Sequence, residues 1–323
     1  MASLLPDQQT LAAHISTLLL TLETTAQAYF QSGQLEPALE ICQMGMQLIQ
    51  RPETTATAQA QLKLVYGNML AVKTNFENTP IEDALLVLEE AKVIAQKTDT
   101  PHLLADALQS IGYAHYMAAS NKREGDPHLL LPYFQQALEH RRRLQDNRGM
   151  SESLFYVGLI SDVLGQMETA RTYYTQALQL AQQHNYPREA FEALRHLGFL
   201  EQVRGNLSQA HHYFAESLQQ LEQANIYVYL PFAHIVLADV CLDQKNTDQA
   251  SFHCQQACEL AEEMHIQKAH IFALLTHGRI CQSKQASEQA REAFAQAYAI
   301  AHTIKLTYAM QQASTAQQNL SSN

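Results

Sequence analysis

A repeat of 40 residues is the feature of this sequence that most limits its fold. Gly158, Gly198, Ala238 and Gly278 follow one another at intervals of 40 residues. Each is followed 12 residues later by an alanine, namely Ala170, Ala210, Ala250 and Ala290. A repeat with a period of roughly 20–50 residues indicates similar units that stack on their neighbours and share one continuous core.

Two more columns of the repeat indicate that each copy is a pair of helices. Four residues after each alanine is a mainly aromatic column, formed by Tyr174, Phe214, Cys254 and Phe294. Three residues further on is a column of small residues: Ala177, Ser217, Ala257 and Ala297. Spacings of three and four residues place side chains on one face of a helix. A turn separates the two helices, as at 164–166 and 204–206.

The same scheme extends towards the N-terminus, where two copies carry insertions at 75–80 and 120–127. We therefore expect a single repeat domain over residues 1–323 with seven copies and a C-terminal cap or tail at 306–323. The expected copies are 19–55, 56–98, 101–146, 150–185, 189–225, 229–266 and 269–305.

Composition supports an all-α chain. Gly 11 and Pro 9 are few for 323 residues, whereas the sequence holds 44 Ala and 38 Gln, both of which favour helices. Hydrophobic residues make up 46%, enough for a core, and no apolar run is long enough to span a membrane. We expect a protein with no membrane partner.

Charge and cysteine usage bear on partners and compartment. With 21 basic and 32 acidic residues the formal charge is −11, which argues against nucleic acid as a ligand. The densest basic patch, 141–143 with Arg148, is interpreted as a solvated helix end. The N-terminus does not resemble a signal peptide, and five cysteines lie within helical patterns, so we expect reduced thiols and a cytoplasmic location.

The columns resemble those of the tetratricopeptide repeat (TPR) family, most closely at LGQMETARTYYTQALQLA, residues 164–181. The resemblance covers about residues 20–305; the sixth copy departs from it, with Lys245 in place of the turn glycine, and the chain has no Trp. It implies a right-handed α-solenoid with a concave groove lined by the first helix of each pair. Arrays with periods near 40, as in kinesin light chains and bacterial transcriptional sensors, mostly bind peptides.

Groove positions follow from the register when residues are counted three before, one after and four after each aligned glycine. A continuous, solvent-facing apolar wall is expected from Tyr113, Tyr116, Phe155, Leu159, Phe199 and Ile235, with Arg195, Asp239 and Arg279 as its charged neighbours. The alternative is that the superhelix is tight, or that the chain dimerises, so that these residues lie in the core. The sequence therefore leaves undecided whether the chain forms a homodimer.

Three classes of function remain open. The first is a module that binds a protein or peptide in the groove, although the Lys and Asn residues of a carboxylate-gripping TPR are missing except for Asn68. The second is a small-molecule sensor or carrier. The third is an enzyme with its active site inside the superhelix, with His196, Arg195, Asp239 and Tyr113 as the most usable groups. The sequence contains no catalytic motif, and we expect no cofactor and no metal site.

Overall fold

The computed structural model describes residues 8–321, and these contain helices and turns but no strand. Residues 1–7 and 322–323 belong to the expected repeat domain but lie outside the described residues. Residues 1–7 are also the start of the N-terminal segment that does not resemble a signal peptide. The α-helices are α1 (Gln8–Gln31), α2 (Leu35–Leu48), α3 (Ala56–Glu77), α4 (Glu82–Lys97), α5 (Pro101–Lys122), α6 (Leu131–Leu144), α7 (Asn147–Val163), α8 (Met167–His184), α9 (Pro187–Val203), α10 (Leu207–Gln223), α11 (Leu230–Asp243), α12 (Thr247–Glu263), α13 (Gln267–Ser283), α14 (Ser287–Thr303) and α15 (Thr307–Ser321).

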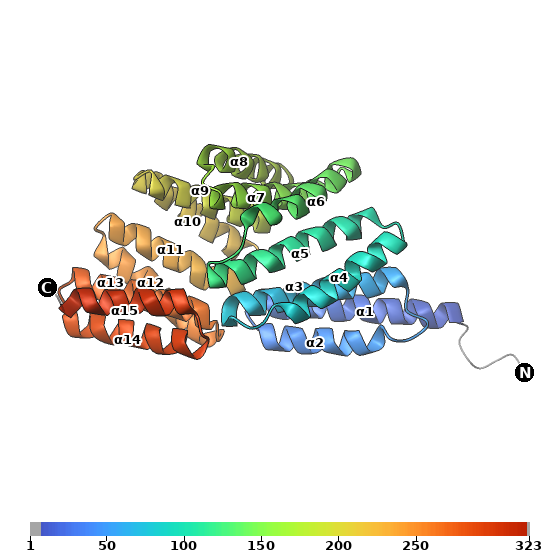
Figure 1. Cartoon of the computed structure of the whole chain (residues 1–323), viewed down its shortest axis with the longest axis horizontal. Coiled ribbons are helices and arrows are strands. Elements are labelled where there is room, and N and C mark those ends of the chain that lie inside the picture. The colour runs from blue at the N-terminus through green and yellow to red at the C-terminus, as the bar shows by residue number, and fades with distance from the viewer. Residues whose placement is uncertain (1–7, 322–323) are drawn as a thin grey trace, which may run out of the picture.

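Consecutive helices form seven antiparallel pairs, from α1/α2 to α13/α14, and α15 packs on α14 at the end of the stack (Figure 1). The second helix of each pair also packs on the first helix of the next. The chain is therefore an all-α solenoid, which confirms the fold class predicted from the repeat. No helix in the described part of the chain combines the length and apolar character that a membrane crossing requires.

The glycine column explains how closely the two helices of a pair approach. A Cβ atom added at Gly198 would lie 2.5 Å from the ring of Phe214, and one added at Gly278 would lie 2.3 Å from the ring of Phe294. Both aromatic rings are essentially fully buried. The aromatic column of the second helix thus packs directly on the glycine of the first helix in the same pair.

The turns within the pairs use the left-handed backbone region. Gly165 and Gly205 have φ values of 76° and 80°, as expected for turn glycines. Lys245 and Gln285 occupy the same place in the sixth and seventh pairs with φ values of 63° and 62°. The sixth copy therefore keeps the turn despite its missing glycine, at a local cost of about 1–2 kcal/mol.

The first helices form the inner layer of the solenoid, and two short 3₁₀ helices precede α6 and α11. The first helices of successive pairs pack on one another as α1–α3–α5, as α7–α9 and as α11–α13. The short helix η1 (Pro127–Leu129) precedes α6, and η2 (Tyr227–Tyr229) precedes α11. The surface formed by the first helices and η2 is called the inner face below.

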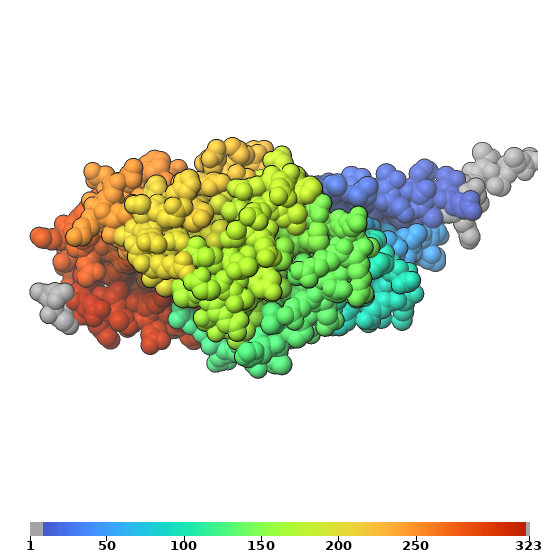
Figure 2. Space-filling model, turned by 90° about the horizontal axis from the view of Figure 1, so that it is seen from above, coloured from blue at the N-terminus to red at the C-terminus, as the bar shows by residue number. Residues whose placement is uncertain are grey.

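The stack curves so that its N-terminal and C-terminal parts come into contact (Figure 1). Helix α3 contacts α13, α1 contacts η2, and α5 contacts α15; these contacts are called the seam. Lys268 in α13 donates hydrogen bonds of 2.7 Å to the amide oxygens of Asn75 and Asn121. Phe76 stacks on Phe232 with ring centroids 5.6 Å apart. Figure 2 shows the middle of the chain lying between the N-terminal and C-terminal parts.

A single buried cluster accounts for this closure. It joins Val72 and Phe76 of α3, Phe191 of α9 and Ile235 of α11 to the interior of the last pairs. Phe76 is only 2% exposed. Apolar side chains from the second, fifth and sixth pairs therefore share one core, so the solenoid gains contacts beyond those between sequence neighbours.

Candidate site on the inner face

Three residues of the expected apolar wall are buried, and for them the expectation of a solvent-facing wall is wrong. Phe155, Leu159 and Ile235 are 5%, 5% and 7% exposed. Phe155 and Leu159 belong to the core of the middle pairs, and Ile235 belongs to the cluster that closes the seam. Because the superhelix is tight, these positions face neighbouring helices, as the alternative interpretation held.

Phe199 packs within its own pair, whereas Asp239 and Arg279 interact with each other across two pairs. Phe199 packs edge-on against Phe214 at 5.2 Å. Arg279 donates a 2.8 Å hydrogen bond to Asp239, and Thr276 donates another of 2.8 Å to the same oxygen. Burial raises the pKa of Asp239, although Arg279 opposes this effect. Asp239 and Arg279 thus link the sixth pair to the seventh.

The other three expected residues, Tyr113, Tyr116 and Arg195, lie together with residues that the register did not identify. The Tyr113 ring is 5.8 Å from the ring of Tyr156, and Arg195 donates a 2.6 Å hydrogen bond to Glu192. The group comes from α5, α7, α9 and η2 and is called the inner polar cluster: Tyr113, Tyr116, Tyr156, Arg188, Glu192, Arg195 and Tyr229.

Electrostatic effects connect the members of the inner polar cluster. Burial raises the pKa of Tyr116 and Tyr229 to about 12 and raises those of Tyr113 and Tyr156 well above the usual value. Glu192 adds to the rise at all four tyrosines. At neutral pH the four side chains are therefore uncharged and can donate hydrogen bonds.

The four tyrosine side chains are partly buried, and their hydroxyls form no hydrogen bond within residues 8–321. Their rings, in contrast, are held by packing, as where Tyr156 stacks on Phe134 at 4.9 Å and Tyr229 on Phe191 at 5.4 Å. The cluster thus presents rigid aromatic side chains with free polar ends.

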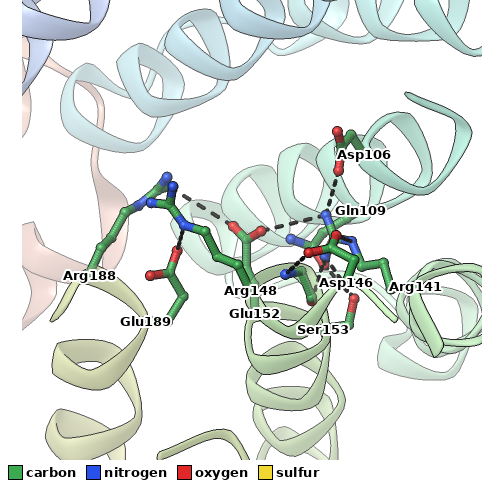
Figure 3. Close-up of polar contacts among 10 residues, drawn as sticks. Asp106, Gln109, Arg141, Asp146, Arg148, Glu152, Ser153, Arg188 and Glu189 are labelled. Carbon is green, nitrogen blue, oxygen red and sulfur yellow. Dashed lines mark hydrogen bonds and ion pairs between the residues drawn. The ribbon is translucent and has the colours of Figure 1, made fainter. Parts of the chain in front are cut away.

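A buried arginine supports the cluster from α6. Arg141 is 3% exposed, so the expectation that it belongs to a solvated helix end is wrong. Its guanidinium donates to the carbonyl of Gly149 (2.9 Å), to Ser153 (2.8 Å), to Gln109 and to Asp106 (2.7 Å) (Figure 3). These bonds fix α5 and α6 to α7.

Further charged residues extend from this network along the inner face (Figure 3). Arg148 donates a 2.9 Å hydrogen bond to Glu189, whose carboxylate is otherwise buried. Glu152 lies 3.6 Å from Arg141 and 4.0 Å from Arg188, so it forms ion pairs with both at distances too long for hydrogen bonds. The Arg188 side chain is 50% exposed. Charges of both signs therefore face the same space as the tyrosine hydroxyls.

The groups named for an enzyme do not form one catalytic arrangement. His196 is enclosed by the rings of Phe155, Tyr174 and Phe199, and burial, with a smaller effect of Arg195, lowers its pKa well below the usual value. Asp239 is paired with Arg279 in a different pair of helices. Among residues 8–321, no three His, Cys, Asp or Glu side chains are arranged to hold a metal ion.

His234 makes the stability of the fold depend on pH. It is 8% exposed, its Nδ1 lies 3.0 Å from Nδ1 of His253, and burial followed by the effect of His253 lowers its pKa to about 4. The unfolded chain binds this proton near pH 6.5 and the folded chain does not, so stability is complete above pH 6.5 and falls below it. At pH 5 the loss from His234 is about 2 kcal/mol.

This loss is measured by urea unfolding at pH 7.5 and pH 5.0. His234→Gln is expected to reduce the difference between the two free energies of unfolding by about 2 kcal/mol relative to wild type. The exposed His102→Gln serves as the control and should leave the difference unchanged. An unchanged difference in His234→Gln would show that His234 does not titrate with folding.

A separate pocket of about 680 Å³ opens on the outer surface near the N-terminus. It lies between the segment that follows α2 and helices α3 and α4, and its lining includes Ile49, Lys63, Leu86, Glu90 and Val93. Lys63 and Glu90 pair across it at 2.5 Å. This pocket is an alternative location for a ligand, and experiments on the inner face need to distinguish the two.

The register missed Arg188 and Glu192 of the inner polar cluster, and Arg148 and Glu152 beside it, for an identifiable reason. Counting three before, one after and four after each glycine samples the central and C-terminal turns of each first helix. Glu152 and Glu192 lie six residues before their glycines, and Arg148 and Arg188 lie ten before. A helical stripe of spacing three to four continued towards the N-terminus reaches these positions. Tyr229 lies in η2 and has no equivalent in the other copies.

Comparison with known proteins places the fold. The family model described as the MalT-like TPR region matches residues 131–321, from α6 to α15. No curated protein sequence matches at a significant level.

Several solved structures are similar. NprR in complex with its cognate peptide NprX is 17% identical, with a TM-score of 0.59 over 84% of this chain and 73% of that chain. The apo quorum sensor NprR from B. thuringiensis is 14% identical, with a TM-score of 0.58 over 98% and 89%. The Rap conjugation gene regulator of plasmid pLS20 in complex with the Phr* peptide is 13% identical, with a TM-score of 0.56 over 95% and 96%.

At these identities the similar structures establish the fold alone. The family model, however, matches more than half of the sequence, including five consecutive second helices with the small and aromatic columns. This chain belongs to the MalT-like TPR family.

Proposed function

We propose that this chain is a peptide-binding regulatory module and that the inner polar cluster is its binding site. The observation that carries the proposal is the set of four packed tyrosines whose hydroxyls have no hydrogen-bond partner in residues 8–321. An extended peptide offers a carbonyl and an N–H group at every residue, and so it can use both the hydroxyls and the charged groups beside them.

Two features favour a peptide over a compact ligand. The cluster draws side chains from α5, α7, α9 and η2, which belong to successive parts of the array, so the site is extended. Among the similar solved structures, NprR was determined with the peptide NprX and a Rap protein with the Phr* peptide. That similarity supports the proposal by analogy of fold, and the residues named here supply the physical argument.

The test removes the hydroxyls and keeps the rings. Full-length protein is incubated with a random seven-residue peptide library, bound peptides are identified by mass spectrometry, and the most enriched peptide is titrated by calorimetry. The triple variant Tyr113→Phe, Tyr156→Phe, Tyr229→Phe is expected to bind it at least about 10-fold more weakly, since each lost hydrogen bond contributes about 0.5–1.5 kcal/mol.

Tyr298→Phe is the matched control, because Tyr298 is exposed on the outer helix α14. It should bind the peptide like wild type, and all variants should unfold at the wild-type urea concentration within error. Equal affinities of the triple variant and wild type, or a library from which no sequence is enriched, would refute peptide binding at this cluster.

A further inference from the structure

Building on the proposed function, we propose that Arg188 binds a carboxylate of the peptide ligand and that Glu152 is the counter-ion which the ligand displaces. The proposal narrows the ligand class to peptides that present a carboxylate, from either an acidic side chain or a free C-terminus. It rests on the pairing of the arginines around the inner polar cluster (Figure 3).

Arg188 is the exception among the four arginines around the cluster. Three have a hydrogen-bonded carboxylate: Arg141 with Asp106 at 2.7 Å, Arg148 with Glu189 at 2.9 Å and Arg195 with Glu192 at 2.6 Å. Arg188 donates no hydrogen bond within the described residues, and its contact with Glu152 is an ion pair at 4.0 Å. All five N–H groups of its guanidinium are therefore free for a ligand.

The existing pair of Arg188 and Glu152 is weak. A half-exposed ion pair without a hydrogen bond contributes little, because water screens it. A ligand carboxylate can instead accept two parallel N–H···O bonds from the guanidinium, the strongest pairing that this group forms. Exchanging Glu152 for a ligand carboxylate is thus favourable for Arg188.

Glu152 keeps a cationic partner after the exchange. Its other oxygen lies 3.6 Å from Nη2 of Arg141, a buried guanidinium whose position is fixed by four hydrogen bonds. Displacement from Arg188 therefore leaves no isolated carboxylate in the protein. This arrangement removes the main cost of bringing a second negative charge to the site.

The surroundings of Arg188 add hydrogen-bond donors. Its charge lowers the pKa of Tyr113, Tyr156 and Tyr229, against the larger effect of burial, so the three hydroxyls lie within its electrostatic reach. The three hydroxyls are uncharged at neutral pH and form no hydrogen bond within residues 8–321. The two nearby carboxylates, Glu189 and Glu192, are each hydrogen-bonded to an arginine of their own, which limits their repulsion of an anion.

The experiment uses two substitutions with opposite expected effects. Full-length protein selects from two random seven-residue libraries, one with a free C-terminal carboxylate and one with a C-terminal carboxamide. The most enriched peptide is titrated against wild type and variants. Arg188→Gln is expected to weaken binding at least about 10-fold through loss of a bidentate pair, and Glu152→Gln to strengthen it about threefold through loss of a competing anion.

Two further variants complete the series. Arg188→Lys keeps the charge but not the planar pair of donors, so its affinity should lie between those of wild type and Arg188→Gln. Arg143→Gln removes one positive charge at a site that is 70% exposed, and it should bind like wild type. Urea unfolding of every variant is compared with that of wild type. Arg188→Gln should unfold like wild type, because the Arg188 side chain makes no hydrogen bond within the described residues.

The two libraries distinguish the sources of the carboxylate. Enrichment only in the free-acid library identifies the C-terminus, and enrichment of Asp or Glu in both identifies a side chain. Weaker binding by Glu152→Gln would indicate a cationic or amide group of the ligand and overturn the proposal. Enrichment of peptides without a preference for a carboxylate would overturn the role of Arg188 but leave the proposal of peptide binding intact. A lack of any enrichment would overturn both proposals.

Discussion

Phe76→Ala is expected to lower the free energy of unfolding by about 3–5 kcal/mol and to open the seam. Phe76 is 2% exposed, stacks on Phe232 and lies in the cluster that joins α3 to α9 and α11. The substitution removes the stacking of α3 on α11 and leaves a cavity in the cluster that joins the N-terminal and C-terminal parts. In an array stabilised only by sequence neighbours, one substitution in α3 would weaken the second pair and leave the curvature unchanged.

Urea unfolding followed by circular dichroism gives the free energy, and small-angle X-ray scattering at low urea gives the radius of gyration. Phe76→Ala should increase the radius of gyration, while Phe252→Ala, at a side chain 58% exposed, should change neither quantity. A lower stability with an unchanged radius of gyration would show that the seam does not depend on this contact.

Arg141→Met is expected to destabilise the protein by about 1.5–3 kcal/mol, because buried hydrogen-bonding groups lose their charged donor. Asp106 loses its 2.7 Å bond, and Gln109, Ser153 and the carbonyl of Gly149 lose the donor that they share. Burial already raises the pKa of Asp106 despite the opposing effect of Arg141. Without Arg141, this carboxyl becomes harder still to ionise.

Thermal and urea unfolding test this prediction, with Arg143→Met as a control that removes the same charge from an exposed position. The control should stay within about 0.5 kcal/mol of wild type, as surface substitutions usually do. If Arg141→Met were equally neutral, the hydrogen bonds of Arg141 would contribute nothing net to stability, and its role as a support of α7 would be wrong.

The helical pairs could be predicted because the repeat records contacts between sequence neighbours. Gly198 and Phe214 meet within one pair, so their spacing recurs in the four C-terminal copies and appears as a column. The seam leaves no such signal. Lys268 and Asn75 are 193 residues apart, and their contact depends on how the curvature of all intervening pairs adds up. Burial of Ile235 follows from that curvature, whereas Phe155 is buried among the middle pairs of the stack.

The buried arginine was in part predictable. Arg141 continues the stripe of Phe134, Ala137 and Leu138, all buried on one face of α6, whereas Arg142 and Arg143 point elsewhere. The run of three arginines suggested a solvated helix end, but the helical register separates the first from the other two. In contrast, the pairing of Arg188 with Glu152 crosses two helices whose relative position only the structure shows.

The central claim is that a peptide binds at the inner polar cluster, and hydrogen–deuterium exchange of the full chain with and without the most enriched library peptide tests it most directly. Binding there should slow exchange in α5, α7, α9 and η2, which carry the cluster, and leave the outer helices α4 and α8 unchanged. Slower exchange confined to 49–63 and 86–94, around the separate N-terminal pocket, would contradict the account by placing the peptide there instead.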